Sequence, residues 1–176
     1  MATNPKRKSL QDLFVHALKD VYYAEKAIAA ALPRMAAKAK HDELKAAIET
    51  HLEETRVHAQ RLEKVFDQLG LEPASVKCEA IDGVLKEGDE ILEDFADGPA
   101  CDAGVVFAAQ AVEHYEITRY GSLLAWAKAL KLAPVADLLK ATLDEEYIAD
   151  DKLTRLAETR ENRQGIVGKA AAIRAA

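Results

Sequence analysis

The chain has 176 residues, a length typical of one compact domain. Its 30 Asp and Glu residues outnumber its 24 Lys and Arg residues, and the resulting net charge of −6 argues against sequence-independent binding of nucleic acid. Hydrophobic residues make up 49% and charged residues 31%, which excludes a disordered chain. Because Gly and Pro are scarce and Ala-rich stretches are common, the composition favours an all-α fold of long helices.

The cysteine content and the amino terminus indicate where the protein works. The two cysteines, Cys78 and Cys101, are too few for the disulfide framework of a small secreted protein. The polar, basic segment Met1–Ser9 is not followed by the apolar stretch of a signal peptide, and no stretch approaches the ~20 apolar residues of a membrane helix. We therefore expect a soluble, cytoplasmic protein with no membrane partner.

Apolar residues spaced three and four apart predict the first two helices. The first is predicted to begin near Ser9, with Asp12 three residues later completing a capping box, and to reach about Ala39. The second is predicted over residues 42–69, ending at Gly70, a residue typical of the position after a helix.

A long connection over residues 71–100 follows, with a short helix predicted at about 80–95. The third long helix is predicted over about 102–132, and the fourth from Pro134 to about 161. A long crossover between the second and third helices lets them run parallel, as in ferritin-like bundles.

These elements predict an all-α, ferritin-like four-helix bundle over residues 1–161, with a short fifth helix in the crossover. Residues 162–176 are predicted to form a C-terminal tail.

Each long helix has an apolar stripe that is broken near its middle by a carboxylate or a histidine. Burying a carboxylate without a partner costs several kcal/mol at least, so four helices with such groups at similar depth need a shared partner, most simply a pair of metal ions. The candidate metal ligands on or beside these stripes are Glu25, Glu54, His58, Glu113, Glu116, Glu146 and Asp150.

The two halves of the chain place these residues at a nearly constant offset. Glu25 and Glu116 are 91 positions apart. The pairs 92 positions apart are Glu54 with Glu146 and His58 with Asp150. This offset is typical of two helical hairpins related by a pseudo-twofold axis, which would gather the groups around one central site.

The residue types indicate which metals such a site would hold. Residues i and i+4 share a helix face, so Glu54 and His58 can address one ion or two adjacent ions. Carboxylates with few imidazoles suit iron or manganese better than structural zinc, so we expect two divalent transition-metal ions, iron or manganese. The general di-iron pattern has Glu-x-x-His on two helices, whereas here the spacing is four and Asp150 replaces the second histidine.

Other roles stay open for several of these residues. His58 can instead be a hydrogen-bonded core residue, and Glu113 and Asp150 can face a neighbouring Arg or Lys. His51 and His114 are reserve ligands, and no residue is assigned a catalytic role.

Several segments together resemble the YciE/YciF family of bacterial stress-response proteins, within the ferritin-like superfamily. The resemblance covers about Leu10 to Leu156. It implies a ferritin-like helical bundle with a di-metal site, a homodimer, and Glu25, Glu54, Glu113, Glu116 and Glu146 as site residues. The segments that carry it are Asp20–Lys26, His51–Thr55, Gln110–Ile117, Tyr120–Gly121 and Leu143–Leu153.

Three functions are compatible with these patterns. The one we favour is a di-iron or di-manganese oxidoreductase that reacts with a small-molecule oxidant, peroxide or dioxygen, during stress. The second in rank is a non-catalytic structural or interaction protein with a polar core network. The third is iron handling without redox turnover.

Overall fold

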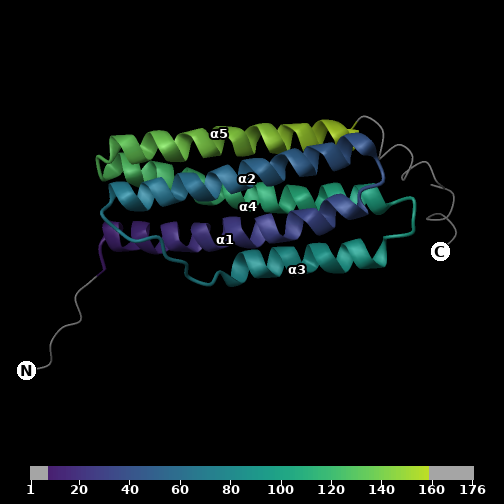
Figure 1. The fold of residues 1–176 in the computed structure, drawn as a ribbon, viewed down its shortest axis with the longest axis horizontal. Coiled ribbons are helices and arrows are strands. Elements are labelled where there is room, and N and C mark those ends of the chain that lie inside the picture. The colour runs from purple at the N-terminus through teal and green to yellow at the C-terminus, as the bar shows by residue number, and fades with distance from the viewer. Residues whose placement is uncertain (1–7, 159–176) are drawn as a thin grey trace, which may run out of the picture.

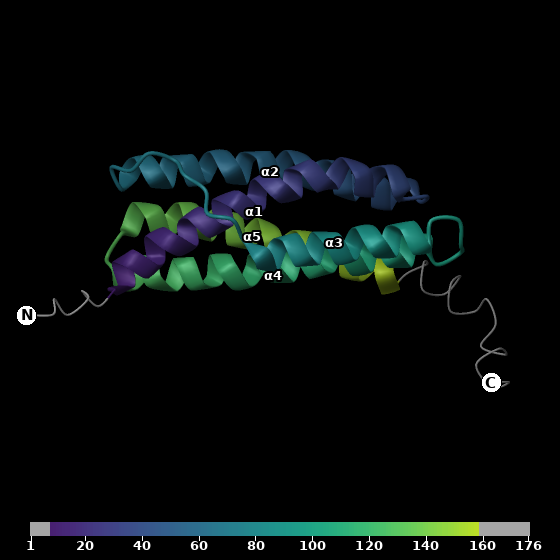
Figure 2. The ribbon, with the colours of Figure 1, turned by 90° about the horizontal axis from the view of Figure 1, so that it is seen from below.

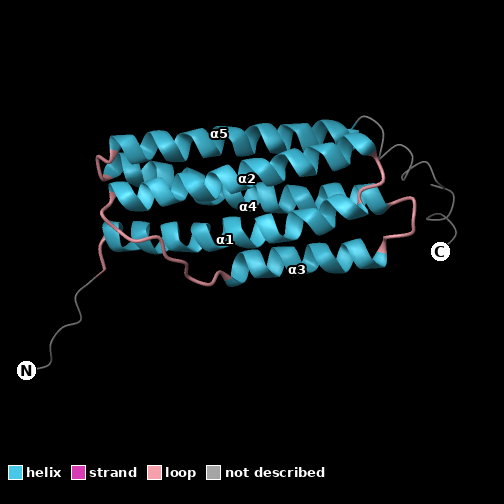
Figure 3. Ribbon diagram, in the orientation of Figure 1, coloured by secondary structure: helices cyan, strands magenta, loops and turns pink. Residues whose placement is uncertain are grey.

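Four long helices and a shorter one form the regular structure of the described residues, 8–158, in the computed structural model (Figures 1 and 3). The all-α bundle with a helix in the crossover is confirmed. The tail predicted over 162–176, and the predicted end of the last helix near 161, lie outside the described residues. The helices are α1 (Leu10–Lys38), α2 (Asp42–Gln68), α3 (Glu79–Asp94), α4 (Cys101–Ala129) and α5 (Ala133–Leu156).

The helix ends follow from local backbone chemistry. The predicted capping box is present, because Ser9 accepts a hydrogen bond from the Asp12 N–H and Asp12 accepts one from the Ser9 N–H. Lys131 adopts a left-handed φ of 59°, and the next N–H bonds back into the last turn at 2.9 Å. As a result α4 ends at Ala129, three residues before the predicted end.

The four long helices form two hairpins, α1 with α2 and α4 with α5. Contacts join α1 to α2, α2 to α5, α5 to α4, and α4 to α1, so the four helices close a ring around one core. In Figure 1, α2 and α4 run in the same direction, as the crossover predicts for a ferritin-like bundle.

The crossover is fastened to the outside of this ring. Figure 2 shows α3 lying along α4 and α1, and it contacts both. The Tyr23 hydroxyl donates to Asp82 at 2.9 Å, and the Val76 N–H donates to the Lys19 carbonyl at 3.2 Å. Because α3 covers the α1–α4 side, the α2–α5 side of the ring stays uncovered by it.

The bundle core consists of two apolar clusters that meet near the middle of the long helices. One contains Ile28 and Leu44, and the other contains Phe14 and Leu139. Buried polar side chains occupy the middle. Within residues 8–158, no helix is long and apolar enough to cross a membrane.

Candidate metal centre

Six buried side chains with possible metal-ligating atoms meet between the two apolar clusters. They come from all four helices of the ring, which explains why every long helix has a polar break in its apolar stripe. Each is at most 6% exposed. They are Glu25 from α1, His51 and His58 from α2, Glu113 and Glu116 from α4, and Glu146 from α5.

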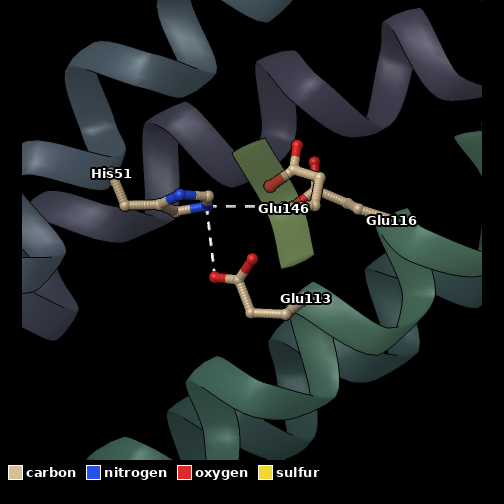
Figure 4. Close-up of side chains that lie close together, drawn as sticks. All are labelled: His51, Glu113, Glu116 and Glu146. Carbon is tan, nitrogen blue, oxygen red and sulfur yellow. Dashed lines mark ion pairs between the residues drawn. The ribbon is translucent and has the colours of Figure 1, made fainter. Parts of the chain in front are cut away.

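One group, shown in Figure 4, is built around His51. Its Nε2 lies 3.3 Å from Glu113 Oε1 and 3.9 Å from Glu116 Oε2. Together with Glu146 these side chains offer four ligand atoms within 4.8 Å of one another. Glu113 and Glu116 reach the same point because residues i and i+3 lie on one helix face.

A second group contains His58, Glu25 and Glu146, so Glu146 belongs to both. His58 Nδ1 lies 2.9 Å from Glu146 Oε1 and 3.9 Å from Glu25 Oε1. The fully buried Tyr120 hydroxyl donates a hydrogen bond to Glu25 Oε1. A carboxylate common to two adjacent groups is suited to bridge two ions.

The other side of His58 is held by residues that the sequence did not single out as site residues. His58 Nε2 lies 2.8 Å from Glu145 Oε2. Arg61 donates to both oxygens of Glu145, at 2.8 and 3.1 Å, and to the Thr142 hydroxyl at 2.7 Å. A carboxylate that accepts the second N–H of an imidazole is a usual companion of metal-bound histidine.

Many polar atoms of the cluster have no hydrogen-bond partner in the described part of the chain. Both oxygens of Glu116, Oε2 of Glu113 and of Glu146, and both ring nitrogens of His51 are buried and make no hydrogen bond, although His51 lies within ion-pair distance of Glu113 and Glu116. Buried polar groups are almost always hydrogen-bonded, so a group of unpaired carboxylate oxygens and imidazole nitrogens fits a shared cation. This donor set of oxygen with some nitrogen suits iron or manganese.

Burial determines the protonation of these groups when no cation is bound. It raises the pKa of Glu25 to about 8. Burial also raises the pKa of Glu113 and Glu116 well above the usual range, and the adjacent Glu146 adds to this. For His58, burial disfavours the charged form, but the contacts with Glu146 outweigh it and raise the pKa to about 9. Protons thus occupy part of the site in the metal-free protein.

The structure brings five of the seven sequence-predicted ligands into these groups, and leaves two outside. The Glu54 side chain is 45% exposed and lies 3.7 Å from His51 Nδ1, and His51 lowers the Glu54 pKa. Asp150 has a side chain that is 21% exposed; Gln110 donates to it at 3.3 Å, and His114 Nε2 lies 3.3 Å away. Metal binding by Glu54 and by Asp150 stays a prediction, as it does for the other five.

His51, which the sequence marked only as a reserve ligand, is a central member of the cluster. The signal for it was present, because His51 lies on the apolar stripe of α2 and Glu54 does not.

Comparisons with known proteins give consistent matches. Residues 9–165 match a family described as a domain of unknown function, DUF892. The chain is 39% identical over 158 residues to Protein YciF of Escherichia coli K12, an alignment that covers 89% of this chain and 95% of that protein.

Solved structures extend these matches to the fold. The crystal structure of the Escherichia coli stress protein YciF matches with a TM-score of 0.83 at 36% identity, over 93% of this chain and all of that one. YcfI of Rhodopseudomonas palustris, provisionally described as a structural protein, matches with a TM-score of 0.82 at 44% identity, over 86% of this chain and 96% of that one.

Proposed function

Because this chain belongs to the DUF892 family and to the YciE/YciF family of bacterial stress-response proteins, we propose that its cluster is a metal centre that acts in the stress response. The buried side chains hold two divalent transition-metal ions, iron or manganese, and the centre reacts with peroxide or dioxygen under stress. The single observation that carries this proposal is the set of unpaired carboxylate oxygens buried in the middle of the bundle.

Charge balance supports a pair of ions. Four buried glutamates, Glu25, Glu113, Glu116 and Glu146, would carry four negative charges, and two divalent ions supply about four positive charges. In the described residues, no Lys or Arg is paired with any of these four carboxylates. The basic groups beside them are the imidazoles of His51 and His58, so two divalent ions would supply most of the balancing charge.

The contacts of the side chains suggest their separate roles. Glu146, which belongs to both groups, would serve both ions, His51 and His58 would each offer a ring nitrogen, and Tyr120 fixes the orientation of Glu25 through its hydrogen bond. A redox-active pair of ions would supply electrons to the oxidant. The protein supplies the buried, water-poor surroundings in which the carboxylates keep their positions.

Metal analysis tests the proposal directly. Protein purified from cells grown with added iron or manganese is expected to contain about two ions per chain, and Glu146→Gln is expected to reduce this content sharply because it removes the shared carboxylate. Asp144→Asn is the matched control, since Asp144 is exposed on the same helix and pairs with Lys140. Fewer than about one ion per chain in wild-type protein, with thermal stability unaffected by added metal, would contradict the proposal.

A structural or interaction protein with a polar core is the second candidate function. It is favoured by the pairing of His58 with Glu145 and Glu146 and by the Tyr120–Glu25 hydrogen bond, which satisfy part of the cluster with protein groups. It leaves the oxygens of Glu116 without a hydrogen-bond partner. A high-resolution map that shows waters or protein groups, and no ion, between His51 and Glu116 after metal soaking would support this candidate.

Sedimentation separates the remaining candidate and tests the oligomer. Iron storage needs a closed shell of many copies, whereas the family resemblance implies a homodimer. We expect a dimer in analytical ultracentrifugation. A closed shell of many copies would favour iron handling instead.

A further inference from the structure

A small pocket opens between α2 and α5, on the side of the ring that α3 does not cover. Its volume is about 90 Å³. Exposed side chains, among them Thr50 and Ile148, lie at its mouth, and Leu32 and Val112 form part of its inner wall.

The pocket reaches one half of the cluster. His51 and Glu113 both belong to its lining, and they are 3.3 Å apart in the His51 group. Neither Glu25 nor His58 lines the pocket. Glu25 accepts a hydrogen bond from Tyr120, which belongs to the other apolar cluster, the one that contains Phe14. A molecule in the pocket would thus lie beside the His51 group.

The lining sets what the pocket can accept. Besides His51 and Glu113, the polar lining residues are Thr50, Glu54 and Lys152, none of them buried, and the inner wall includes Met35, Ile48 and Leu153. The aliphatic part of this wall offers no hydrogen bonds to replace those that a polar molecule makes with water. An apolar cavity of roughly 150 Å³ holds benzene or xenon, so a pocket of about 90 Å³ suits a molecule of only a few heavy atoms.

We infer that this pocket is a binding site for a small, uncharged, apolar molecule, held against the His51 and Glu113 side of the cluster. This inference rests on the proposed function and extends it, because it identifies the half of the cluster that a co-substrate would contact. Both halves keep their proposed ions; the His58 half does not line this pocket, and the His51 half faces the co-substrate.

Xenon is the probe that tests the site. Crystals of the full chain pressurised with xenon are expected to show one anomalous peak in the pocket, whether the protein is metal-free or loaded with manganese. Two variants fill the pocket from opposite walls, Ala47→Leu on α2 and Ala109→Leu on α4, and each is expected to abolish the peak. The use of two walls keeps the test informative if one variant fails to fold.

Ala46→Leu is the matched control, because Ala46 is exposed and adjacent to Ala47 but outside this lining. It should leave the xenon peak intact. The inference would be overturned if the wild-type pocket binds no xenon, or if both filled variants bind xenon with the occupancy of the wild type. Since xenon needs no metal, this failure would be distinct from failure of the metal proposal, which metal analysis measures.

A second probe distinguishes the two sources of an apolar ligand. Titration with 1-propanol, followed by NMR shifts of Ala47 and Ala109, tests for the alkyl end of an organic molecule. Competition between 1-propanol and xenon would assign an organic substrate, and binding of xenon alone would assign a gas-sized one. Binding of neither would overturn the site.

Discussion

His58 Nε2 lies 2.8 Å from Glu145 Oε2 while its Nδ1 lies 2.9 Å from Glu146 Oε1, so adjacent residues of α5 hold the two sides of one imidazole. Glu146 is fully buried, whereas Glu145 is partly exposed and paired with Arg61. The outer carboxylate fixes the ring, and the ring thereby presents Nδ1 to the cluster.

Loss of the outer carboxylate should weaken metal binding without removing a ligand. Glu145→Gln is expected to reduce metal affinity by about 10- to 100-fold, because outer partners of metal-bound histidine have effects of that size. Competition titration against a chelator of known affinity measures the change. Asp144→Asn, one residue earlier on the same helix, should bind metal as the wild type does. Equal affinities of all three proteins would refute a positioning role for Glu145.

The metal-free protein should lose stability as pH rises. The pKa of Glu25 is raised to about 8 from 4.5 and that of His58 to about 9 from 6.5, so the folded state holds both protons more tightly than the unfolded state does. The stability that these two groups contribute is complete below their unfolded-state pKa values and is lost as pH rises through their folded-state pKa values.

Thermal unfolding between pH 5 and pH 9, with chelator and with added manganese, measures this effect. The melting temperature of the chelated protein is expected to fall with pH, and the gain from metal should grow, because cations replace the protons. Glu25→Gln should flatten the chelated curve. If the melting temperature of the chelated wild-type protein stays constant across this range, the raised pKa values of Glu25 and His58 are contradicted.

Tyr120 should contribute to stability through its hydroxyl. Tyr120→Phe keeps the ring in the core but removes the donor to Glu25, at an expected cost of about 1 to 3 kcal/mol in the metal-free protein. Denaturant unfolding measures the change. Thr118→Val on the same helix is a control, since its exposed hydroxyl only bonds to the His114 carbonyl. If the two variants are equally stable, the buried bond carries no net stabilisation.

A substitution in the core should separate stability from metal binding. Leu139→Ala, in the cluster that also contains Phe14, is expected to lower the free energy of unfolding by about 2 to 5 kcal/mol through the cavity that it leaves. The folded variant should keep the metal content of the wild type, because Leu139 belongs to neither group of candidate ligands. Metal analysis of folded protein, alongside denaturant unfolding, gives both quantities.

The helices could be predicted from sequence because their signals are local. Apolar spacing gave α1, α2 and α3 to within a few residues, and Ser9 with Asp12 marked the first helix start correctly. The end of α4 could not be predicted, since Lys131 adopts a left-handed φ without the usual glycine.

The candidate groups could be predicted in part, and the position of Glu54 outside them has a geometric cause. In the structure, buried positions in the first hairpin match buried positions in the second at a single offset of 91 residues. This offset pairs Thr55 with Glu146 and His51 with Thr142, and all four are buried. The offset of 92 moves each pairing by one residue, which is about 100° around a helix. The offset of 92 therefore pointed to Glu54 instead of the adjacent buried residue, Thr55.

Glu145 and Arg61 could not be predicted, because their contacts depend on how α2 and α5 are rotated against each other. Sequence spacing fixes which residues share a face of one helix, but the packing of the whole ring fixes which faces meet across helices. The pairing of Glu145 with Arg61 and His58 is therefore visible only in the folded structure.

The packing of α3 gives the molecule a back and a front. Glu87 and Glu90 lie exposed on α3, which contacts α1 and α4, whereas the pocket mouth lies between α2 and α5. A spin label or a surface tether attached at Glu87 or Glu90 would thus sit behind the bundle and leave the mouth free. Ligand access could then be followed on an immobilised protein whose pocket mouth faces the solution.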